Sequence, residues 1–389
     1  MAKPEIRLKG FKGEWEKMSF SEMVNRVATS GDTKTMPGVE FEDIISGEGV
    51  LNKDINNKKI NKVGKCFEPG DVLFGKLRPY LKNILLADFK GVAIGDFWVL
   101  RPNKINSNLL YMLVSSNNFM KVANISSGSK MPRADWNLVF NSHFYIPKEK
   151  DEQKAISDYF KSLDSMIQGV TKKIASLKQM KQACLVSMFP QAGETTPRVR
   201  FKGFKDEWKS VCFGSLIKEC LDRSVIENED VLLSSSIEGM FLNSELFGHQ
   251  RGRSNIGYKK IRKNMMILSA QNLHLGNANV NLRFDHGLVS PAYKIYDLIG
   301  CSPLFMYCWI KREEAKKFFL DATTAGASLC RKNIIWNDLY NQRIFMPSIE
   351  EQSKIGLFFT SLDKQISLQE ARLEKLKQIK AACLDKMFV

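Results

Sequence analysis

Two segments of the chain repeat apolar residues at steps of three and four positions, the spacing of one face of a coiled-coil helix. The first segment is 152–189 and the second is 351–388. At about 1.5 Å per residue, each predicts a helix of roughly 57 Å, which is too long to bury its apolar stripe on one compact domain. We therefore expect the two helices to pack on each other. The predicted coiled-coil seam is Leu163, Ile167, Val170, Ile174, Leu177, Leu362, Ile366, Leu373 and Leu376.

The two blocks that precede these helices mix strand and helix patterns. Ser107 is the expected cap of a helix that continues to residue 123, and Ser302 followed by Pro303 predicts the start of a matching helix in the second block. Short apolar runs bounded by turn residues predict strands. Each block is therefore expected to be an α+β domain, with strands at 70–77, 82–87, 91–100, 237–242 and 290–296.

The chain is an imperfect tandem repeat. Residues 4–20 match residues 197–213 at nine of seventeen positions, and the two helical segments match at seventeen of thirty-eight. A period near 195 residues is too long for a solenoid and indicates two duplicated domains. Antiparallel packing of the long helices would relate the halves by a pseudo-twofold axis. The predicted division is a first variable block at 1–150, a long helix at 151–190, a second variable block at 191–349 and a second long helix at 350–389.

The net charge of the chain is +16, and it divides as +8 in each half. Hydrophobic residues make up 44% of the sequence, which is enough for folded cores and excludes a disordered basic tail. The N-terminal residues lack the apolar run of a signal peptide, and no stretch reaches the roughly 18 apolar residues of a membrane span. We expect a cytoplasmic protein, away from membranes, whose basic surface binds a polyanion.

The sequence contains no recognisable catalytic motif. It has no GxxxxGK[ST] phosphate loop, no HExxH, no GxSxG, and no [DN]PP[YF] motif of the kind with which DNA amino-methyltransferases hold a flipped base. The eight cysteines include no CxxC pair, so no zinc site is expected. We therefore expect no catalytic residue, no metal and no cofactor in this chain, which leaves recognition as its activity.

Basic loops are the candidates for recognition. Lys and Arg bind phosphates, whereas Arg, Gln and Asn read base edges through paired hydrogen bonds. Both kinds of residue occur together in the loops of each block. The alternative is that these side chains are only solvated loop charges. The candidate DNA-binding residues are Lys76, Arg78, Tyr80, Lys82, Lys130, Arg133, Gln250, Arg251, Arg253, Lys259, Gln271, Asn272, Arg331 and Lys332.

Taken together, these features resemble the specificity (S) subunit of Type I restriction-modification systems. The resemblance is carried by the paired motifs RLKGFKGEW and RFKGFKDEW, the turn GDVLFGKLRPYL, the segment VSPAY, and the helix starts PKEKDEQKAI and PSIEEQSKI, each followed by SLD. Each fragment alone is only moderately specific. Their order, repeated twice around a variable block, is very specific.

The resemblance implies that 1–150 and 191–349 are two target-recognition domains, each reading one half of a split double-stranded DNA sequence through the major groove. The antiparallel helices would act as a ruler for the unread spacer. The resemblance also implies docking of two methyltransferase (M) subunits on 163–189 and 362–388, and the presence of restriction (R) subunits. S-adenosylmethionine, ATP and Mg are then expected on the partner subunits. Because the second block departs from the GDVLFGKL motif, contacts should not be copied between the halves.

Two other functions compete with this interpretation. A stand-alone DNA-modifying enzyme would bind S-adenosylmethionine or cut DNA by itself, and the missing motifs oppose it. A coiled-coil scaffold with non-specific nucleic-acid binding would not distinguish one bipartite duplex from scrambled duplexes.

Overall fold

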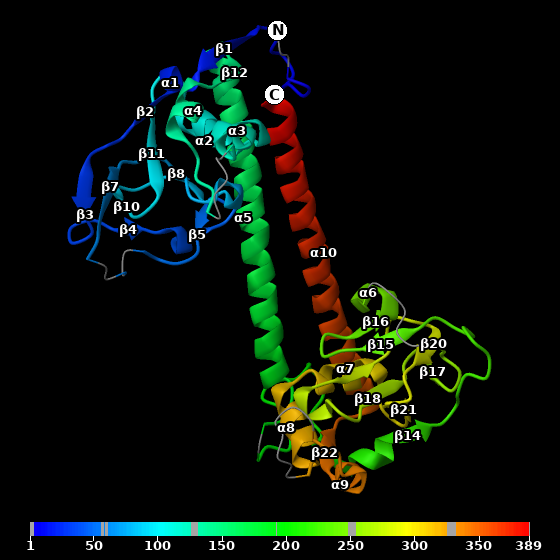
Figure 1. Cartoon of the computed structure of the whole chain (residues 1–389). Coiled ribbons are helices and arrows are strands. Elements are labelled where there is room, and N and C mark those ends of the chain that lie inside the picture. Colours follow the sequence, from blue (N-terminus) through cyan, green and yellow to red (C-terminus); the bar gives the residue numbers. More distant parts are fainter. Residues whose placement is uncertain are drawn as a thin grey trace. The chain divides into compact units, whose positions relative to one another are not determined.

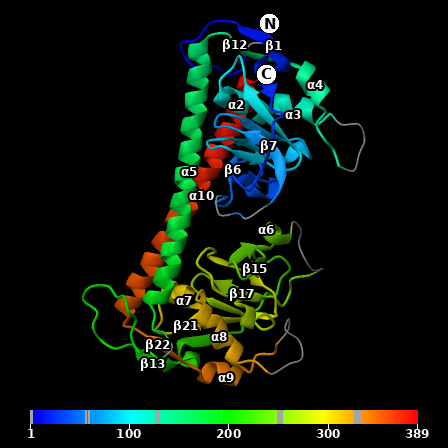
Figure 2. The same ribbon diagram turned by 90° about the vertical axis from the view of Figure 1, so that its left-hand side faces the viewer.

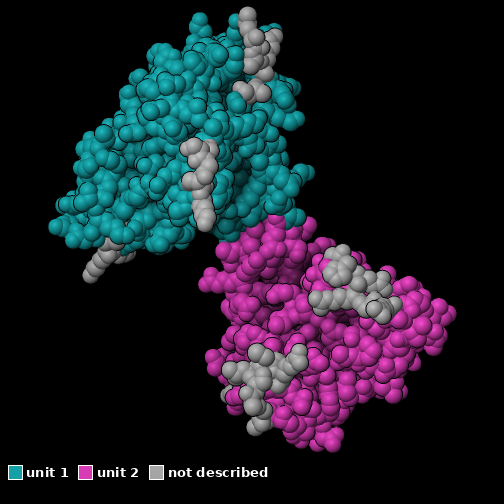
Figure 3. All heavy atoms as spheres, viewed as in Figure 1, with its two compact units in different colours: residues 1–172, 371–389 teal, residues 173–370 magenta. Residues whose placement is uncertain are grey.

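The computed structural model describes residues 4–55, 58, 61–125, 131–191, 193–247, 254–324 and 332–388. The chain divides into two compact units (Figure 3). Unit 1 consists of 1–172 with 371–389, and unit 2 of 173–370. The long helices α5 (Lys150–Ser187) and α10 (Ile349–Met387) each contribute one end to unit 1 and the other end to unit 2 (Figure 1). Each unit therefore combines one variable block with parts of both long helices, and the fold mixes helix and sheet as predicted.

Unit 1 is layered around an antiparallel sheet with the strand order β2-β11-β8-β9. Alternation along the strands gives the sheet two buried faces. Phe74 and Trp98 face a core shared with α2, α3 and both long helices, whereas Leu73 and Val99 face a core shared with the sheet β3-β7-β10-β4. The elements are β1 (Trp15–Ser19), α1 (Phe20–Met23), β2 (Val24–Arg26), β3 (Ser30–Asp32), β4 (Gly38–Val39), η1 (Phe41–Asp43), β5 (Ile44–Ile45), β6 (Val50–Leu51), β7 (Val63–Phe67), β8 (Val72–Gly75), η2 (Pro79–Leu81), β9 (Ile84–Leu86), β10 (Gly91–Ala93), β11 (Phe97–Pro102), α2 (Ser107–Ser115), α3 (Asn117–Ala123), α4 (Trp136–Asn141) and β12 (His143–Pro147).

Unit 2 repeats this plan with the strand order β14-β21-β18-β19. Met266 and Tyr296 face the core that contains α7, α8 and the long helices, and Ile267 and Ile295 face a second core. The second layer differs from that of unit 1, because it consists of the two-stranded pairs β15-β16 and β17-β20. The elements are β13 (Lys209–Cys212), η3 (Phe213–Leu216), β14 (Ile217–Cys220), β15 (Leu233–Ser235), β16 (Met240–Leu242), α6 (Asn243–Phe247), β17 (Lys259–Arg262), β18 (Met266–Ser269), η4 (Leu273–Leu275), β19 (Ala278–Val280), β20 (His286–Val289), β21 (Tyr293–Leu298), α7 (Pro303–Ile310), α8 (Glu313–Asp321), α9 (Trp336–Asn341) and β22 (Arg343–Met346).

The sequence motifs that recur in both halves make the same contacts in both units. Arg7 forms an ion pair with Glu152 at 2.6 Å in unit 1, and Arg200 forms one with Glu351 at 2.7 Å in unit 2. The motif tryptophans pack on the last aromatic residue of the opposite half: Trp15 on Phe388 at 6.1 Å, and Trp208 on Phe189 at 6.0 Å between ring centroids. The arginine of each motif therefore fastens its block to the start of its own half's helix, and the tryptophan fastens the block to the far end of the other half's helix.

Within each unit the two long helices run antiparallel (Figure 2). In unit 1, Asp164 pairs with Lys380 at 2.6 Å. In unit 2, the repeat-equivalent residues Asp363 and Lys181 pair at 2.5 Å. Among the predicted seam residues, the side chains of Leu163, Val170, Ile174, Leu177, Leu362 and Ile366 are buried, and those of Ile167, Leu373 and Leu376 are partly buried.

Some predicted boundaries in the first block are wrong. The segment 91–100 forms parts of two strands, because the chain turns at Gly95, whose φ is +93°. The predicted helix is capped by Asn106 rather than Ser107, since the Asn106 side chain accepts a hydrogen bond from the first turn of α2. The helix is also broken at Ser116, whose hydroxyl caps α3. The side-chain cap competes with helix continuation at this residue.

The second block shows similar differences. β16 covers only the last three residues of the predicted strand 237–242, and β21 begins at Tyr293 rather than at residue 290. The helix that starts at Pro303 ends at Ile310, and α8 follows after Arg312. Arg312 is buried, and its guanidinium lies 4.6 Å from the Phe189 ring centroid, so this break serves tertiary packing.

No helix among the described residues is both long enough and apolar enough to cross a membrane.

Candidate nucleic-acid interface

The turn between β8 and β9 carries the first group of candidate residues. It is closed by a hydrogen bond from Gly75 N to Asn83 O of 2.9 Å. Arg78 and Lys82, which flank η2, both have left-handed backbone conformations with φ of 49° and 50°. Such conformations are uncommon outside glycine and are held here by the surrounding hydrogen bonds. The turn exposes the side chains of Arg78 and Tyr80.

A second segment, 131–135, lies against this turn. Arg78 N donates to Pro132 O at 2.8 Å, and Ala134 N donates to Lys76 O at 2.9 Å. The segment places Arg133 beside Asp96, with 2.9 Å between Nη2 and Oδ2, and Lys76 reaches the same carboxylate at 3.3 Å. Burial alone would raise the pKa of Asp96, but hydrogen bonds from Arg133 and Lys76 outweigh it and hold the pKa below the usual carboxyl value.

Lys82 points away from this exposed group. Its ammonium donates to Ser115 O at 3.1 Å and to Asn117 Oδ1 at 3.3 Å, at the C-terminal end of α2. Burial lowers the pKa of Lys82. Cations are favourable at a helix C-terminus because they bind carbonyl groups that lack helical partners. In this structure, Lys82 holds the turn to α2.

The corresponding turn in unit 2 lies between β18 and β19. It is closed by the equivalent hydrogen bond, from Ser269 N to Asn277 O at 3.1 Å. Strand register places Asn272 where unit 1 has Arg78, and Gly276 where unit 1 has Lys82. Gln271 is exposed and Asn272 is half-buried. The two turns therefore share a backbone plan but present different chemistry.

The remaining candidates do not join one surface. Lys259 lies on β17 with only 5% of its surface exposed, and burial lowers the pKa of its ammonium, so it does not present a charge at the surface. Lys332 is half-buried. Lys130, Gln250, Arg251, Arg253 and Arg331 lie outside the described residues.

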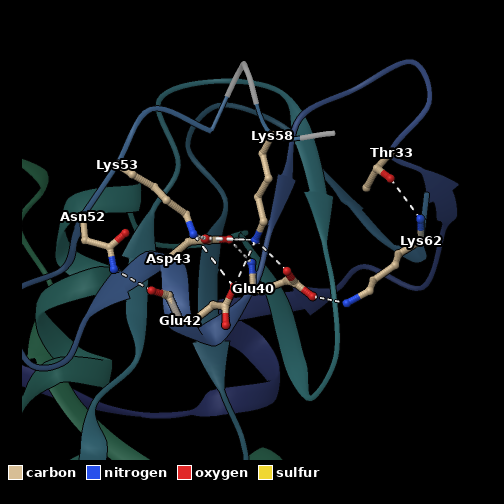
Figure 4. A network of polar contacts seen from close by, with 8 residues as sticks. All are labelled: Thr33, Glu40, Glu42, Asp43, Asn52, Lys53, Lys58 and Lys62. Carbon is tan, nitrogen blue, oxygen red and sulfur yellow. Dashed lines mark hydrogen bonds and ion pairs between the residues drawn. The ribbon is translucent and has the colours of Figure 1, made fainter. Parts of the chain in front are cut away.

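Other lysines of unit 1 are engaged in ion pairs near η1 (Figure 4). The buried carboxylate of Asp43 contacts Lys53 and Lys58, each at 2.8 Å. Glu40 contacts Lys58 and Lys62, each at 2.5 Å. Burial would raise the pKa of Asp43, but the lysine hydrogen bonds lower it overall. Local Lys content therefore overestimates the cationic surface of this block.

One cation that the sequence motifs did not single out is held over an aromatic ring. The guanidinium of Arg26, at the end of β2, lies 4.7 Å from the ring centroid of Trp136. In unit 2, the ammonium of Lys294 lies 4.4 Å from the ring centroid of Trp336, the repeat-equivalent tryptophan. The two tryptophans occupy corresponding places in the repeated sequence, but the cations come from strands far away in the sequence.

Among the described residues, no three His, Cys, Asp or Glu side chains lie together as metal ligands. The groups that the two turns present are hydrogen-bond donors and acceptors: an exposed guanidinium and phenol in unit 1, and one exposed and one half-buried amide in unit 2. Such donors and acceptors are the groups that contact phosphates and base edges in nucleic-acid complexes.

No protein-family model matches the chain. A stretch of 138 residues is 24% identical to the Type I restriction enzyme EcoDI specificity subunit of Escherichia coli, and it spans 34% of this chain and only 30% of that relative. The Type I restriction-modification S subunit from M. genitalium has a similar structure, with a TM-score of 0.60 at 12% identity, covering 100% of this chain and 99% of that one.

A second similar structure comes from work on complex assembly and conformational transition of the type I R-M system. It gives a TM-score of 0.56 at 18% identity and covers 97% of this chain and 98% of that one. The resemblance to Type I specificity subunits is thereby confirmed, in sequence over a third of the chain and in fold over nearly all of it.

Proposed function

We propose that this chain is the DNA-specificity subunit of a Type I restriction-modification complex. In this proposal it is not itself an enzyme. Each variable block reads one half of a bipartite double-stranded DNA target, and the long helices set the distance between the two halves. The sequence resemblance and the shared fold support this assignment.

The observation that carries the proposal is that the β8–β9 and β18–β19 turns, called the reading turns below, share a backbone plan but carry different side chains. Both turns are closed by the same backbone hydrogen bond, yet one presents Arg78 and the other Gln271 and Asn272. Arginine pairs best with guanine, whereas glutamine and asparagine pair best with adenine. A duplicated scaffold with unlike reading residues is suited to two unlike half-sites.

The charge distribution supports the same proposal. Each half of the chain carries a net charge of +8, although each also contains ion pairs that neutralise individual lysines. Phosphate contacts provide salt-dependent affinity without sequence information, and base contacts provide the choice. Two equally basic halves are suited to two separate contacts along one duplex.

The long helices supply the proposed docking surfaces for two methyltransferase subunits. The helices contribute to each unit in the same way and are joined by equivalent ion pairs, Asp164–Lys380 and Asp363–Lys181. Each methyltransferase subunit would therefore dock on a similar helical surface. S-adenosylmethionine would then be bound by the methyltransferase subunits, and ATP and Mg by restriction subunits where these are present.

The proposal is tested by competition binding with the chain assembled with its methyltransferase partners. The target is first defined by methylome sequencing of the host with and without the gene. The intact bipartite duplex is expected to bind about 10³-fold or more tightly than a duplex with both half-sites scrambled. Equal affinity for the two duplexes would contradict the proposal and favour a non-specific scaffold.

A substitution at Arg78 sharpens the test. If Arg78 reads a guanine, Arg78→Ala should weaken binding to the target by about 1–3 kcal/mol and relax the preference at one base position. Binding to the scrambled duplex is the control, because a base contact contributes little there. Unchanged target affinity would reduce Arg78 to a solvated loop charge.

A further inference from the structure

The side chain of Arg26, at the edge of the unit 1 sheet, is held in place by an aromatic ring. Its guanidinium stacks over Trp136 at 4.7 Å, and Trp136 is itself fixed by an edge contact with Trp98, at 5.1 Å between ring centroids. Arg26 is exposed. A guanidinium stacked on a fixed indole has lost much of its rotamer freedom before any ligand binds, while the N–H groups around its edge remain available.

The equivalent position in unit 2 carries the opposite charge. Arg26 pairs with Leu100 across the sheet, and the matching strand pair in unit 2 places Glu219 opposite Tyr296. There the cation over the tryptophan is Lys294, which comes from the adjacent strand and forms an ion pair with Glu219 at 2.9 Å. The cation at this site in unit 2 is therefore neutralised by the adjacent Glu219. In unit 1, no described residue forms an ion pair with Arg26.

Arg26 is connected through Trp136 to the β8–β9 turn that is proposed to face DNA. Trp136 is the first residue of α4 and directly follows segment 131–135, which carries Arg133 and is hydrogen-bonded to the turn that carries Arg78. β2 is the edge strand of its sheet, two strands away from β8, where the turn begins. At about 4.8 Å per strand, this puts the Arg26 backbone roughly 10 Å to the side of β8. The register also places Arg26 level with Val72, three residues before the turn begins, which adds roughly 10 Å along the strand.

We propose that Arg26, stacked on Trp136, contacts a DNA backbone phosphate that flanks the half-site read by unit 1. This inference rests on the proposed function, since it assumes that the turn faces DNA. A phosphate is favoured over a base because the distance to the turn is several base-pair steps and because planar Arg donors match phosphate oxygens. Unit 2 makes no such contact at the equivalent site, because Glu219 already neutralises its cation.

The test measures affinity and its salt dependence for the assembled complex with Arg26→Ala and with Arg26→Lys. A phosphate contact predicts that Arg26→Ala weakens binding to target and scrambled duplexes by the same factor, about tenfold. It also predicts that the salt slope, the slope of log K against log salt concentration, decreases in magnitude by about 1. Arg26→Lys should recover part of this loss, because it keeps the charge but not the planar donor fork.

Two control variants isolate the effect. Lys17→Ala removes an exposed cation from β1, and Glu219→Gln combined with Lys294→Gln removes the neutral pair in unit 2. Both should leave the affinity within about twofold of that of the unmodified complex and the salt slope unchanged. Thermal unfolding of Arg26→Ala should match that of Lys17→Ala, which shows that the loss of affinity is not a loss of folding.

Three outcomes would overturn the inference. Unchanged affinity would make Arg26 a surface residue without a DNA contact. A loss confined to the target duplex would assign it to a base instead of a phosphate. A lower thermal stability that accounts for the whole loss would make Arg26 a packing residue. Failure of the proposed function is seen separately, as equal affinity of the unmodified complex for target and scrambled duplexes.

Discussion

At the scale of single residues, the described interface depends on how charges are shared rather than on how many there are. Asp96 binds both Lys76 and Arg133, so two candidate cations contribute about one net charge at that point. Arg78 and Arg26 are exposed. The carboxylate also fixes the plane of the Arg133 guanidinium, which can favour one contact geometry on DNA.

Replacing this carboxylate should lower discrimination. Asp96→Ala frees Lys76 and Arg133, and a freed cation binds any phosphate. We expect affinity for scrambled duplexes to rise about threefold and the steepness of its salt dependence to increase. Target affinity should not rise by the same factor, because Arg133 loses its orientation. A titration against both duplexes measures the ratio, and an unchanged ratio would contradict an orienting role for Asp96.

The ion-pair network at Asp43 predicts a pH dependence for unit 1. The pKa of this buried carboxyl is lowered in the folded state, so its stabilising contribution is complete above the usual carboxyl pKa and is lost as the pH falls through the lowered value. Asp43→Asn should therefore destabilise unit 1 by about 2 kcal/mol at pH 7 and by less at pH 3.

Thermal unfolding at the two pH values checks this expectation. Asp164→Asn is a useful comparison, because its carboxylate is more exposed than that of Asp43 and a smaller effect is expected. An equal loss of stability at pH 7 and pH 3 for Asp43→Asn would contradict the assigned electrostatic role.

Sequence reasoning reached some of these residues and missed others for physical reasons. Arg78 and Tyr80 follow from turn and charge patterns, and their turn is present. Arg133 follows from its charge pattern and lies on the segment that is hydrogen-bonded to this turn. Lys82 and Lys259 look alike in sequence, but one caps a helix end and the other is buried, which depends on tertiary packing. Arg26 could not be identified, because its partner Trp136 is more than a hundred positions away.

At the scale of elements, the long helices were predictable because their periodicity is local. The points at which the shorter helices of each block break were less predictable. The interruption at Ser116 depends on a side-chain cap, and the one after Ile310 on burial of Arg312, neither of which changes the apolar pattern. Each motif tryptophan packs on the aromatic residue at the end of the opposite half's helix, a contact that joins segments far apart in the sequence.

The two equivalent ion pairs between the helices should stabilise their antiparallel register. Asp164→Lys places a second cation against Lys380, and Lys380→Asp restores an opposite pair when the two changes are combined. Both side chains are less than a third exposed, so we expect a coupling of about 1 kcal/mol in a double-mutant cycle. The stability of unit 1 can be followed by hydrogen exchange of its amides.

The pair Lys178–Glu370 provides a matched control, because it also joins the two helices but both side chains are about half exposed. The same charge swap there should give a smaller coupling, since solvent screens it. A coupling at Asp164–Lys380 no larger than at the control pair would mean that apolar packing alone fixes the register.

At the scale of the whole molecule, the internal repeat explains both the fold and the proposed function. Equivalent motifs join each block to the long helices through equivalent ion pairs. The blocks differ in their second sheet layer and in their reading turns. The repeat was visible in the sequence because the fastening residues are repeated. The assignment of each helix end to the opposite half's block was not visible, because it depends on packing between distant segments.

The central claim is that the two blocks read DNA independently. Residues 191–349 should be replaced by the corresponding block of another specificity subunit, and the methylome of a host that carries the chimaera and its methyltransferase subunits should be sequenced. We predict that one half of the methylated sequence changes while the other half stays the same. A change in both halves, or a sequence that does not change at all, would contradict the account.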